Sequence, residues 1–195
     1  MSASPRCRDP RVTRWLYMVA TITFCLIVFG GFVRLTRSGL SIVEWNPVQG
    51  VLPPMTAQDW QNEFAKYQAT PEFRTVNYEM TLAGYQRIFY VEWAHRLIAR
   101  IAGLVVVIPL LIFLSRGVIP LRQSGLFIGI VLLFGLQGFL GWFMVSSGLL
   151  DRPSVSHYRL TVHLLTALLL LAMTTWAAMN RSACTATALH RRGHS

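Results

Sequence analysis

The sequence predicts an all-α integral membrane protein: a bundle of four transmembrane helices with a long structured extracytoplasmic loop between helices 1 and 2. Two observations predict this class. First, 53% of the 195 residues are hydrophobic and only 13% are charged, whereas a soluble domain carries about 25% charged residues. Second, the chain contains separate apolar stretches that each reach the length of about 20 residues at which a helix crosses a bilayer.

The predicted membrane domain covers residues 15–179. The first span follows several Arg residues, as the apolar part of a signal peptide would, but it is longer than the roughly 7–15 residues of such a segment. We therefore interpret it as a membrane helix. The predicted spans cover residues 15–36, 88–114, 125–146 and 158–179.

The chain is strongly basic, with 18 Lys and Arg against 8 Asp and Glu and a formal net charge of +10. A nucleic-acid-binding module places such residues along a solvated face among polar neighbours. Here they lie mainly around the apolar runs. We therefore expect membrane lipid, and no nucleic acid, as a partner.

The positions of Lys and Arg also predict the orientation of the chain. The tails 1–14 and 180–195 and the connection 115–124 carry more Arg than acid, whereas the segments 37–87 and 147–157 do not. Basic segments stay on the cytoplasmic side of a membrane. We expect both basic tails to be cytoplasmic in a bacterial inner membrane, or on the matrix side in a mitochondrion.

The loop 37–87 is long enough to have structure of its own. Thr56 and Asp59 have the spacing of a capping box, and the aromatic residues that follow recur at helical spacing. These predict a short amphipathic helix that rests on the membrane surface or covers the bundle. Thr81 ahead of Leu82 predicts that the second span begins as a helix in water. The aromatic residues are Trp60, Phe64 and Tyr67.

Several ionisable residues lie inside the predicted spans, where they are costly and usually functional. Glu92, His95, Arg96 and Arg100 are at offsets of 0, 3, 4 and 8 in the second span, which places them on one side of a helix. In the fourth span, Arg159 precedes His163 by one turn. These residues are the candidate site.

The two histidines are predicted to lie at one depth. His95 is about 10 Å, and His163 about 8 Å, along its helix from the same membrane surface. Paired imidazoles on parallel helices of a four-helix bundle are typical of a heme held by two axial ligands. Zinc is disfavoured because only Glu92 is available as a further ligand. The alternative for each His is a core side chain bonded to a backbone carbonyl.

Three arginines near the same surface are candidates for binding heme propionates, because Arg pairs with carboxylates in bidentate fashion. The alternative is that each one extends to lipid phosphate. Small residues in the spans would let helices and a flat ring approach closely. The arginines are Arg34, Arg96 and Arg159, and the glycines are Gly30, Gly31, Gly129, Gly135, Gly138 and Gly141.

Several motifs together resemble the heme A synthase family, in its proteobacterial and mitochondrial branch. The resemblance extends from about Trp15 to Met179 and covers the N-terminal half of the family pattern only. The motifs are GGFVRLTRSGLSIVEWNPVQGVLPP at 30–54, EWAHR at 92–96, LQGFLGWFMV at 136–145, SGL at 147–149 and YRLTVHL at 158–164.

The resemblance implies a protein of eight helices in two similar halves, each with a His pair. One half would hold heme b as cofactor, and the other would hold the substrate heme O, whose C8 methyl group is oxidised to the formyl group of heme A. By motif, Glu92 matches the essential acid, and His95 and His163 match the axial ligands of the heme iron. Arg34, Glu44 and Trp45 fall in the signature around the first loop.

The sequence thus favours a heme O oxidoreductase, a heme A synthase or its N-terminal half, serving cytochrome oxidase assembly. A homodimer or a separate four-helix half would supply the second His pair, and heme O synthase would hand over the substrate. The alternatives are a b-type cytochrome or heme carrier without oxidase chemistry, and an inactive truncated family member. Glu92 discriminates between them, because electron transfer alone needs no acid beside the porphyrin.

Overall fold

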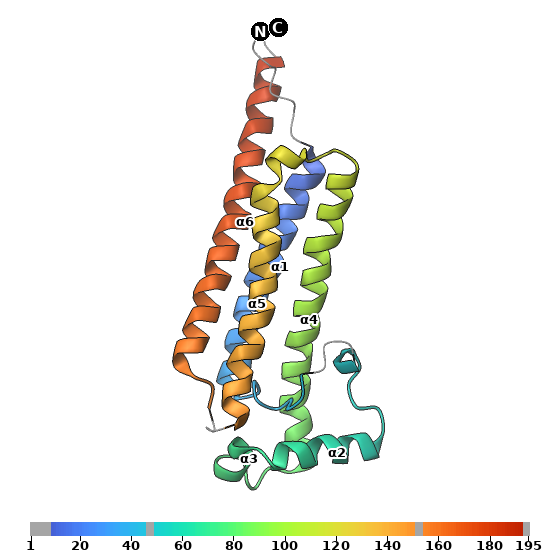
Figure 1. The fold of residues 1–195 in the computed structure, drawn as a ribbon, viewed down its shortest axis with the longest axis vertical. Coiled ribbons are helices and arrows are strands. Elements are labelled where there is room, and N and C mark those ends of the chain that lie inside the picture. Colours follow the sequence, from blue (N-terminus) through green and yellow to red (C-terminus); the bar gives the residue numbers. More distant parts are fainter. Residues whose placement is uncertain (1–8, 46–48, 151–153, 193–195) are drawn as a thin grey trace.

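The computed structural model describes residues 9–45, 49–150 and 154–192, and within these it contains helices and no strand. Four long helices stand side by side, and short helices lie across one end of them (Figure 1). The elements are α1 Pro10–Leu35, η1 Gln49–Val51, α2 Ala57–Gln68, α3 Pro71–Thr75, α4 Leu82–Ser115, η2 Leu121–Gln123, α5 Gly125–Leu150 and α6 His157–Arg192.

The four long helices pack in a ring in which α1 contacts α4, α4 contacts α5, α5 contacts α6 and α6 contacts α1. This order places α4 and α6 diagonally across the bundle, where they run in the same direction (Figure 1). Each of the four contains a segment long and apolar enough to cross a membrane. The predicted class, a four-helix membrane bundle, is therefore confirmed.

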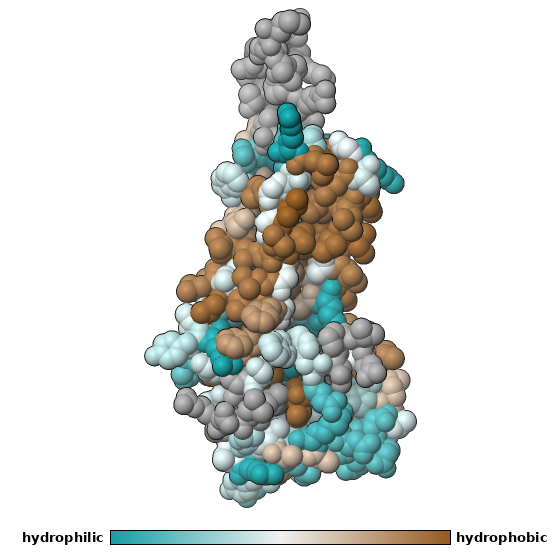
Figure 2. Space-filling view, in the orientation of Figure 1, coloured by the Kyte–Doolittle hydropathy of each residue, from teal (hydrophilic) through white to brown (hydrophobic). Residues whose placement is uncertain are grey.

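The surface of the bundle is apolar over its middle. Figure 2 shows hydrophobic side chains gathered there, and hydrophilic ones gathered at the end where α2 and α3 lie. Many large apolar side chains point outward, among them Phe24, Leu132 and Leu169. In a soluble protein such a surface would be unfavourable, so it indicates contact with lipid.

The tightest apolar packing lies in the half of the bundle that contains the start of α1. Trp15 is buried there against Phe113 and Phe127, and its indole N–H donates to the carbonyl of Val105 at 2.8 Å. Leu16 and Ile130 are fully buried in the same cluster. The opposite half, toward α2 and α3, has fewer buried apolar side chains in the bundle interior.

The loop between α1 and α4 forms a small layer of its own. The capping box predicted at Thr56 and Asp59 is present at the start of α2. The aromatic side of α2 is buried against Tyr85 and Phe89 of α4. Of the two predicted placements, this helix therefore covers the bundle, and its aromatic side is not exposed. Thr81 caps α4, which begins at Leu82 as the sequence predicted.

All four long helices extend beyond the predicted spans, and the reasons are clearest for α1 and α6. α1 begins at Pro10, because Asp9 caps it by accepting from the backbone N–H of Arg11 at 2.8 Å, and proline is favoured in a first turn. α6 continues through most of the predicted tail to Arg192. Alanine is frequent in that stretch, and it is the strongest helix former.

Candidate functional site

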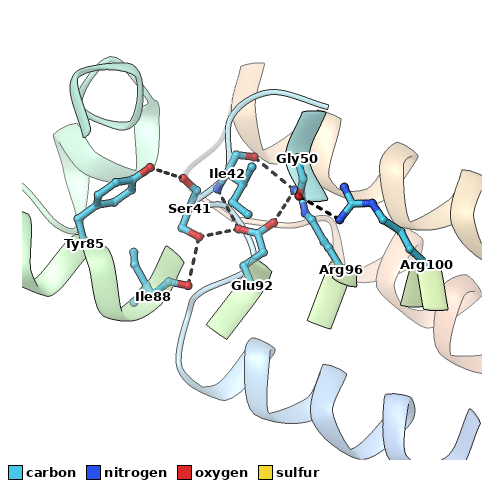
Figure 3. A network of polar contacts seen from close by, with 8 residues as sticks. All are labelled: Ser41, Ile42, Gly50, Tyr85, Ile88, Glu92, Arg96 and Arg100. Carbon is cyan, nitrogen blue, oxygen red and sulfur yellow. Dashed lines mark hydrogen bonds and ion pairs between the residues drawn. The ribbon is translucent and has the colours of Figure 1, made fainter. Parts of the chain in front are cut away.

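Glu92 lies at the centre of a polar network between α4 and the chain that follows α1 (Figure 3). Its side chain is buried, and Oε2 accepts from Oγ of Ser41 at 2.7 Å and from the backbone N–H of Ile42 at 2.9 Å. Oε1 forms an ion pair with Arg96, one turn further along α4. Three donors thus hold one buried carboxylate.

The same network attaches the segment after α1 to α4 at several levels. Arg96 also donates to the carbonyl of Ile42 at 3.3 Å and lies 5.2 Å from the ring of Trp45. Arg100 donates to the carbonyl of Gly50 at 3.3 Å (Figure 3). The hydroxyl of Tyr85 donates to the carbonyl of Ser41 at 3.2 Å. The loop is therefore held along one side of α4 at Ser41, Ile42, Trp45 and Gly50.

His95 faces a different neighbour from Glu92. Its ring packs edge-on against Phe29 of α1, at 5.6 Å between ring centroids. At about 100° per residue, His95 is turned about 60° to one side of Glu92, while Arg96 is turned about 40° to the other. The sequence predicted that these residues share one side of the helix. In the structure, His95 faces α1 and the others face the loop.

His163 lies on α6, and its Nδ1 is buried without a hydrogen-bond partner among the residues the structure describes. A buried polar atom without a partner usually indicates a missing ligand, ion or water. His95 and His163 are close enough to interact electrostatically. Gln137 of α5 fixes the adjacent backbone, because its Nε2 donates to Oγ1 of Thr166 at 2.6 Å and to the carbonyl of His163 at 3.4 Å.

Small residues stand beside both imidazoles. A Cβ placed on Gly30 would lie 3.4 Å from Nε2 of His95, and one on Gly141 would lie 3.7 Å from Cε1 of His163. The other glycines predicted to admit a flat ring, at positions 31, 129, 135 and 138, have nothing within 4 Å of such a Cβ. Two glycines on opposite helices, α1 and α5, thus leave room next to the rings.

These features fit a planar group bound between α4 and α6. The imidazoles come from diagonal, parallel helices, Nδ1 of His163 has no partner, and small residues adjoin both rings. No group of three or more His, Cys, Asp or Glu side chains able to hold a metal ion occurs in the described part of the chain. The two imidazoles are the residues that could hold the iron of a tetrapyrrole here.

The predicted propionate-binding arginines differ in their surroundings. Arg34 lines a cavity of about 310 Å³ at the end of the bundle where α3 lies. Arg159 donates to the carbonyl of Phe143 at 2.6 Å and lies 3.7 Å from the centroid of its ring. Arg96 is engaged by Glu92 and Ile42. Because a guanidinium has five N–H donors, Arg96 and Arg159 keep some for a further acceptor.

Sequence reasoning missed two charged residues of this cavity, Arg37 and Glu72. Glu72 is only 4% exposed, and it accepts from the hydroxyl of Tyr67 at 3.4 Å. Burial raises the pKa of Glu72 to about 7. Its position after Thr70 and Pro71 is typical of an acid in the first turn of a helix, so nothing local distinguishes it.

The fold and the histidine pair define a class: a four-helix membrane protein with half-buried imidazoles on diagonal helices. Sequence comparison gives the family. The family model described as COX15-CtaA, cytochrome oxidase assembly protein, matches residues 13–194, and the chain belongs to this family.

Curated relatives carry the name heme A synthase. The chain is 47% identical over 176 residues to that of Sphingopyxis alaskensis, covering 90% of this chain and 50% of the relative. It is 51% identical over 170 residues to that of Rhizobium leguminosarum bv. trifolii, covering 87% and 46%. For Rickettsia felis the identity is 49% over 159 residues, covering 82% and 47%.

The chain therefore spans about half the length of the curated relatives it matches. The resemblance predicted from the motifs is confirmed. No solved structure gave a significant match to the chain.

Proposed function

We propose that this chain is the N-terminal, heme-binding half of a heme A synthase. In this proposal it acts in the oxidation of the C8 methyl group of heme O to the formyl group of heme A, for cytochrome oxidase assembly. Membership of the family and the name of the relatives support it. The observation that carries it is the pair His95 and His163, which lie on parallel diagonal helices with glycines beside both rings.

The two imidazoles would hold the heme iron through their ring nitrogens. His163 has its Nδ1 free of protein partners in the described residues, while the ring of His95 packs against Phe29 of α1. The heme would supply an iron centre for electron transfer, or the methyl group itself when heme O is bound. Arg34, Arg96 and Arg159 would pair with its propionates, because all three are cationic and lie toward the outer end of the bundle.

Glu92 would act near the edge of the heme, on a proton or on a positive charge. Two roles are open to such an acid, proton transfer and stabilisation of positive charge at the reacting carbon. Three donors to its carboxylate, from Ser41, Ile42 and Arg96, favour the second role, because they hold a negative charge at a fixed place.

The proposal also includes the partners of the protein and its location in the cell. A second copy of this chain or a separate four-helix half would supply the second His pair, with heme b as its cofactor. Heme O synthase would deliver the substrate. We place the protein in the bacterial inner membrane with both termini cytoplasmic, because α1 starts and α6 ends at the end of the bundle where the connection 115–124 also lies.

A second candidate function is a b-type cytochrome or heme carrier, or an inactive truncated family member. One observation favours it: the contacts of Glu92 go to the segment after α1, so this acid has a structural use without any oxidation. The two functions differ in whether Glu92 is needed for chemistry or only for the fold.

The test is the identity of the bound pigment. The chain would be expressed in a host that makes heme O, with and without a co-expressed C-terminal half, and the extracted pigment would be identified by mass. The proposal expects heme O and products oxidised at C8. A pigment of heme b alone, with no oxidised product either with or without the C-terminal half, would support the cytochrome or carrier. An absence of any bound heme would overturn both.

A further inference from the structure

The cavity at the outer end of the bundle is lined by charged groups that the proposed chemistry at the heme iron does not use. It has a volume of about 310 Å³ and lies between the end of α1, α3, α5 and the start of α6. Gly30, which stands beside His95, is part of its wall. The cavity thus adjoins the surroundings of His95 at Gly30, and its wall includes Arg34, Arg37 and Glu72.

Arg37 occupies a backbone position that normally selects glycine. The N–H of Ser38 donates to the carbonyl of Val33 at 3.0 Å, and the N–H of Arg37 donates to that of Arg34 at 3.3 Å. This is the Schellman pattern that ends a helix, and the residue at its centre is left-handed and usually Gly. Arg37 has φ of 52°. An arginine held there at a conformational cost indicates that its side chain has a use.

The side chain of Arg37 reaches the cavity, where it attracts the carboxyl of Glu72 electrostatically. Within the described part of the chain, neither Arg34 nor Arg37 forms an ion pair with a protein acid, although both line the cavity. Two cations beside an apolar wall are suited to bind the carboxylates of an amphiphilic ligand. Apolar side chains complete the lining: Val33, Leu40, Val76, Met144, Val155 and Leu160.

Glu72 is the one acid among the described residues of this lining, and it is buried. The groups that face it are the hydroxyl of Tyr67 from α2, the guanidinium of Arg37 after α1, and, at longer range, the carboxylate of Glu92 from α4. A charged Glu72 would repel an incoming carboxylate. A protonated Glu72 would instead donate a hydrogen bond to it.

We propose that this cavity is the carboxylate subsite of the heme site, with Arg34 and Arg37 supplying positive charge and Glu72 supplying the proton of its carboxylic acid. The proposal rests on the function proposed above, because it needs a heme between His95 and His163. It assigns roles to Arg37 and Glu72 and couples heme binding to one proton. Because burial raises the pKa of Glu72 to about 7, this coupling falls near neutral pH.

The experiment compares two probes on the full chain in detergent: heme b and its dimethyl ester, which has no free carboxylate. Affinities would be measured from the low-spin spectrum between pH 6 and 8.5. Above about pH 7 we expect the affinity for heme b to fall with a slope that approaches tenfold per pH unit, since binding then requires uptake of one proton. The ester should show no such dependence.

Variants separate the two residues. Glu72→Gln should keep heme b affinity high and remove its pH dependence, while Glu79→Gln, an exposed acid nearby, should behave as the wild type. Arg37→Gln should weaken heme b about five- to tenfold and leave the ester unchanged, as expected for one charge-assisted contact. Arg74→Gln, an exposed cation on α3, is its control.

Arg37→Gly distinguishes binding from a structural role, because glycine relieves the left-handed backbone. We expect the chain to melt higher but to bind heme b more weakly. Equal affinities of wild type, Arg37→Gly and Glu72→Gln for heme b at every pH, with low-spin spectra intact, would overturn the subsite alone. Failure of the wild type to give a low-spin spectrum with either probe would overturn the proposed function and the subsite with it.

Discussion

Glu92 and Arg96 form an ion pair one turn apart on α4, and both also bind the backbone of Ile42, which follows α1. The pair is buried, so removing either charge would leave the other without compensation. The acid proposed to act at the heme is therefore also an attachment point of the first loop. Any test of its chemistry has to separate these two roles.

Replacing Glu92 with Gln should separate heme binding from heme oxidation. Gln keeps the size and one carbonyl oxygen for Ser41 or Ile42 but removes the negative charge. We expect heme to remain bound, because His95 and His163 are intact, while conversion of heme O to heme A falls about tenfold or more. Pigment extracted from a host that makes heme O, with the C-terminal half co-expressed, gives both quantities.

Ser41→Ala is the matched control for that experiment, because it removes one donor to Glu92 and leaves the charge in place. It should weaken the loop attachment by about 1–3 kcal/mol and retain oxidation. If Glu92→Gln and Ser41→Ala lose bound heme equally, Glu92 is structural. Unchanged heme A formation in Glu92→Gln would remove this residue from the mechanism.

The axial ligands can be tested one at a time. His95→Ala or His163→Ala should abolish the low-spin heme spectrum, because each removes one of two nitrogen ligands on diagonal helices. His157→Ala, in the exposed first turn of α6, should retain it. Visible absorption of the purified variants measures the outcome, and a full low-spin spectrum in all three would refute the proposed ligands.

The space beside His95 can be tested by filling it. Gly30→Val should reduce the occupancy of low-spin heme about tenfold, because a Cβ there already lies 3.4 Å from Nε2 of His95 and the branched methyls need more room. Gly31→Val is the neighbouring control, since nothing lies within 4 Å of its Cβ. Equal heme content in the two variants would place the heme elsewhere.

The helices could be predicted from sequence because their signals are local. Apolar length gave the spans, and caps at Thr56 and Thr81 gave the starts of α2 and α4. Which side chains of α4 face the loop and which face α1 could not be predicted in the same way. Glu92 is turned toward Ser41, a residue 51 positions away, and that contact depends on the path of the loop.

The cavity lined by Arg37 and Glu72 could not be predicted from the sequence for a related reason. Glu72 is buried because α3 contacts the bundle at α5, and no periodicity in a five-residue helix reports that packing. The left-handed backbone of Arg37 could not be predicted, because the sequence has Arg at a position where such a turn favours Gly. By contrast, His95 and His163 were recognisable, since their depths follow from the rise of a helix alone.

The orientation of the bundle is open to a direct measurement. Reporter fusions at residue 65, in α2, should report the outer side, and fusions at residue 119, between α4 and α5, should report the cytoplasmic side. Basic residues at the end of the bundle with residue 119 are the reason. A cytoplasmic signal from residue 65 would reverse the orientation and place the carboxylate subsite on the inner surface.

The last prediction concerns the stability of the chain without heme. The pKa of Glu72 is raised by burial from its ordinary 4.5 to about 7, so between these values the folded chain holds a proton that the unfolded chain has lost. The free energy of unfolding should therefore fall as pH rises from about 4.5 to about 7, by up to about 3 kcal/mol, and then level off. Glu72→Gln should flatten this dependence and melt higher than the wild type at pH 8, with the two proteins converging in stability toward pH 4.5.

Thermal unfolding in detergent, followed by Trp fluorescence, measures this pH dependence, with Glu79→Gln as the exposed control. Parallel pH profiles for wild type and Glu72→Gln would show that Glu72 stays charged in the fold.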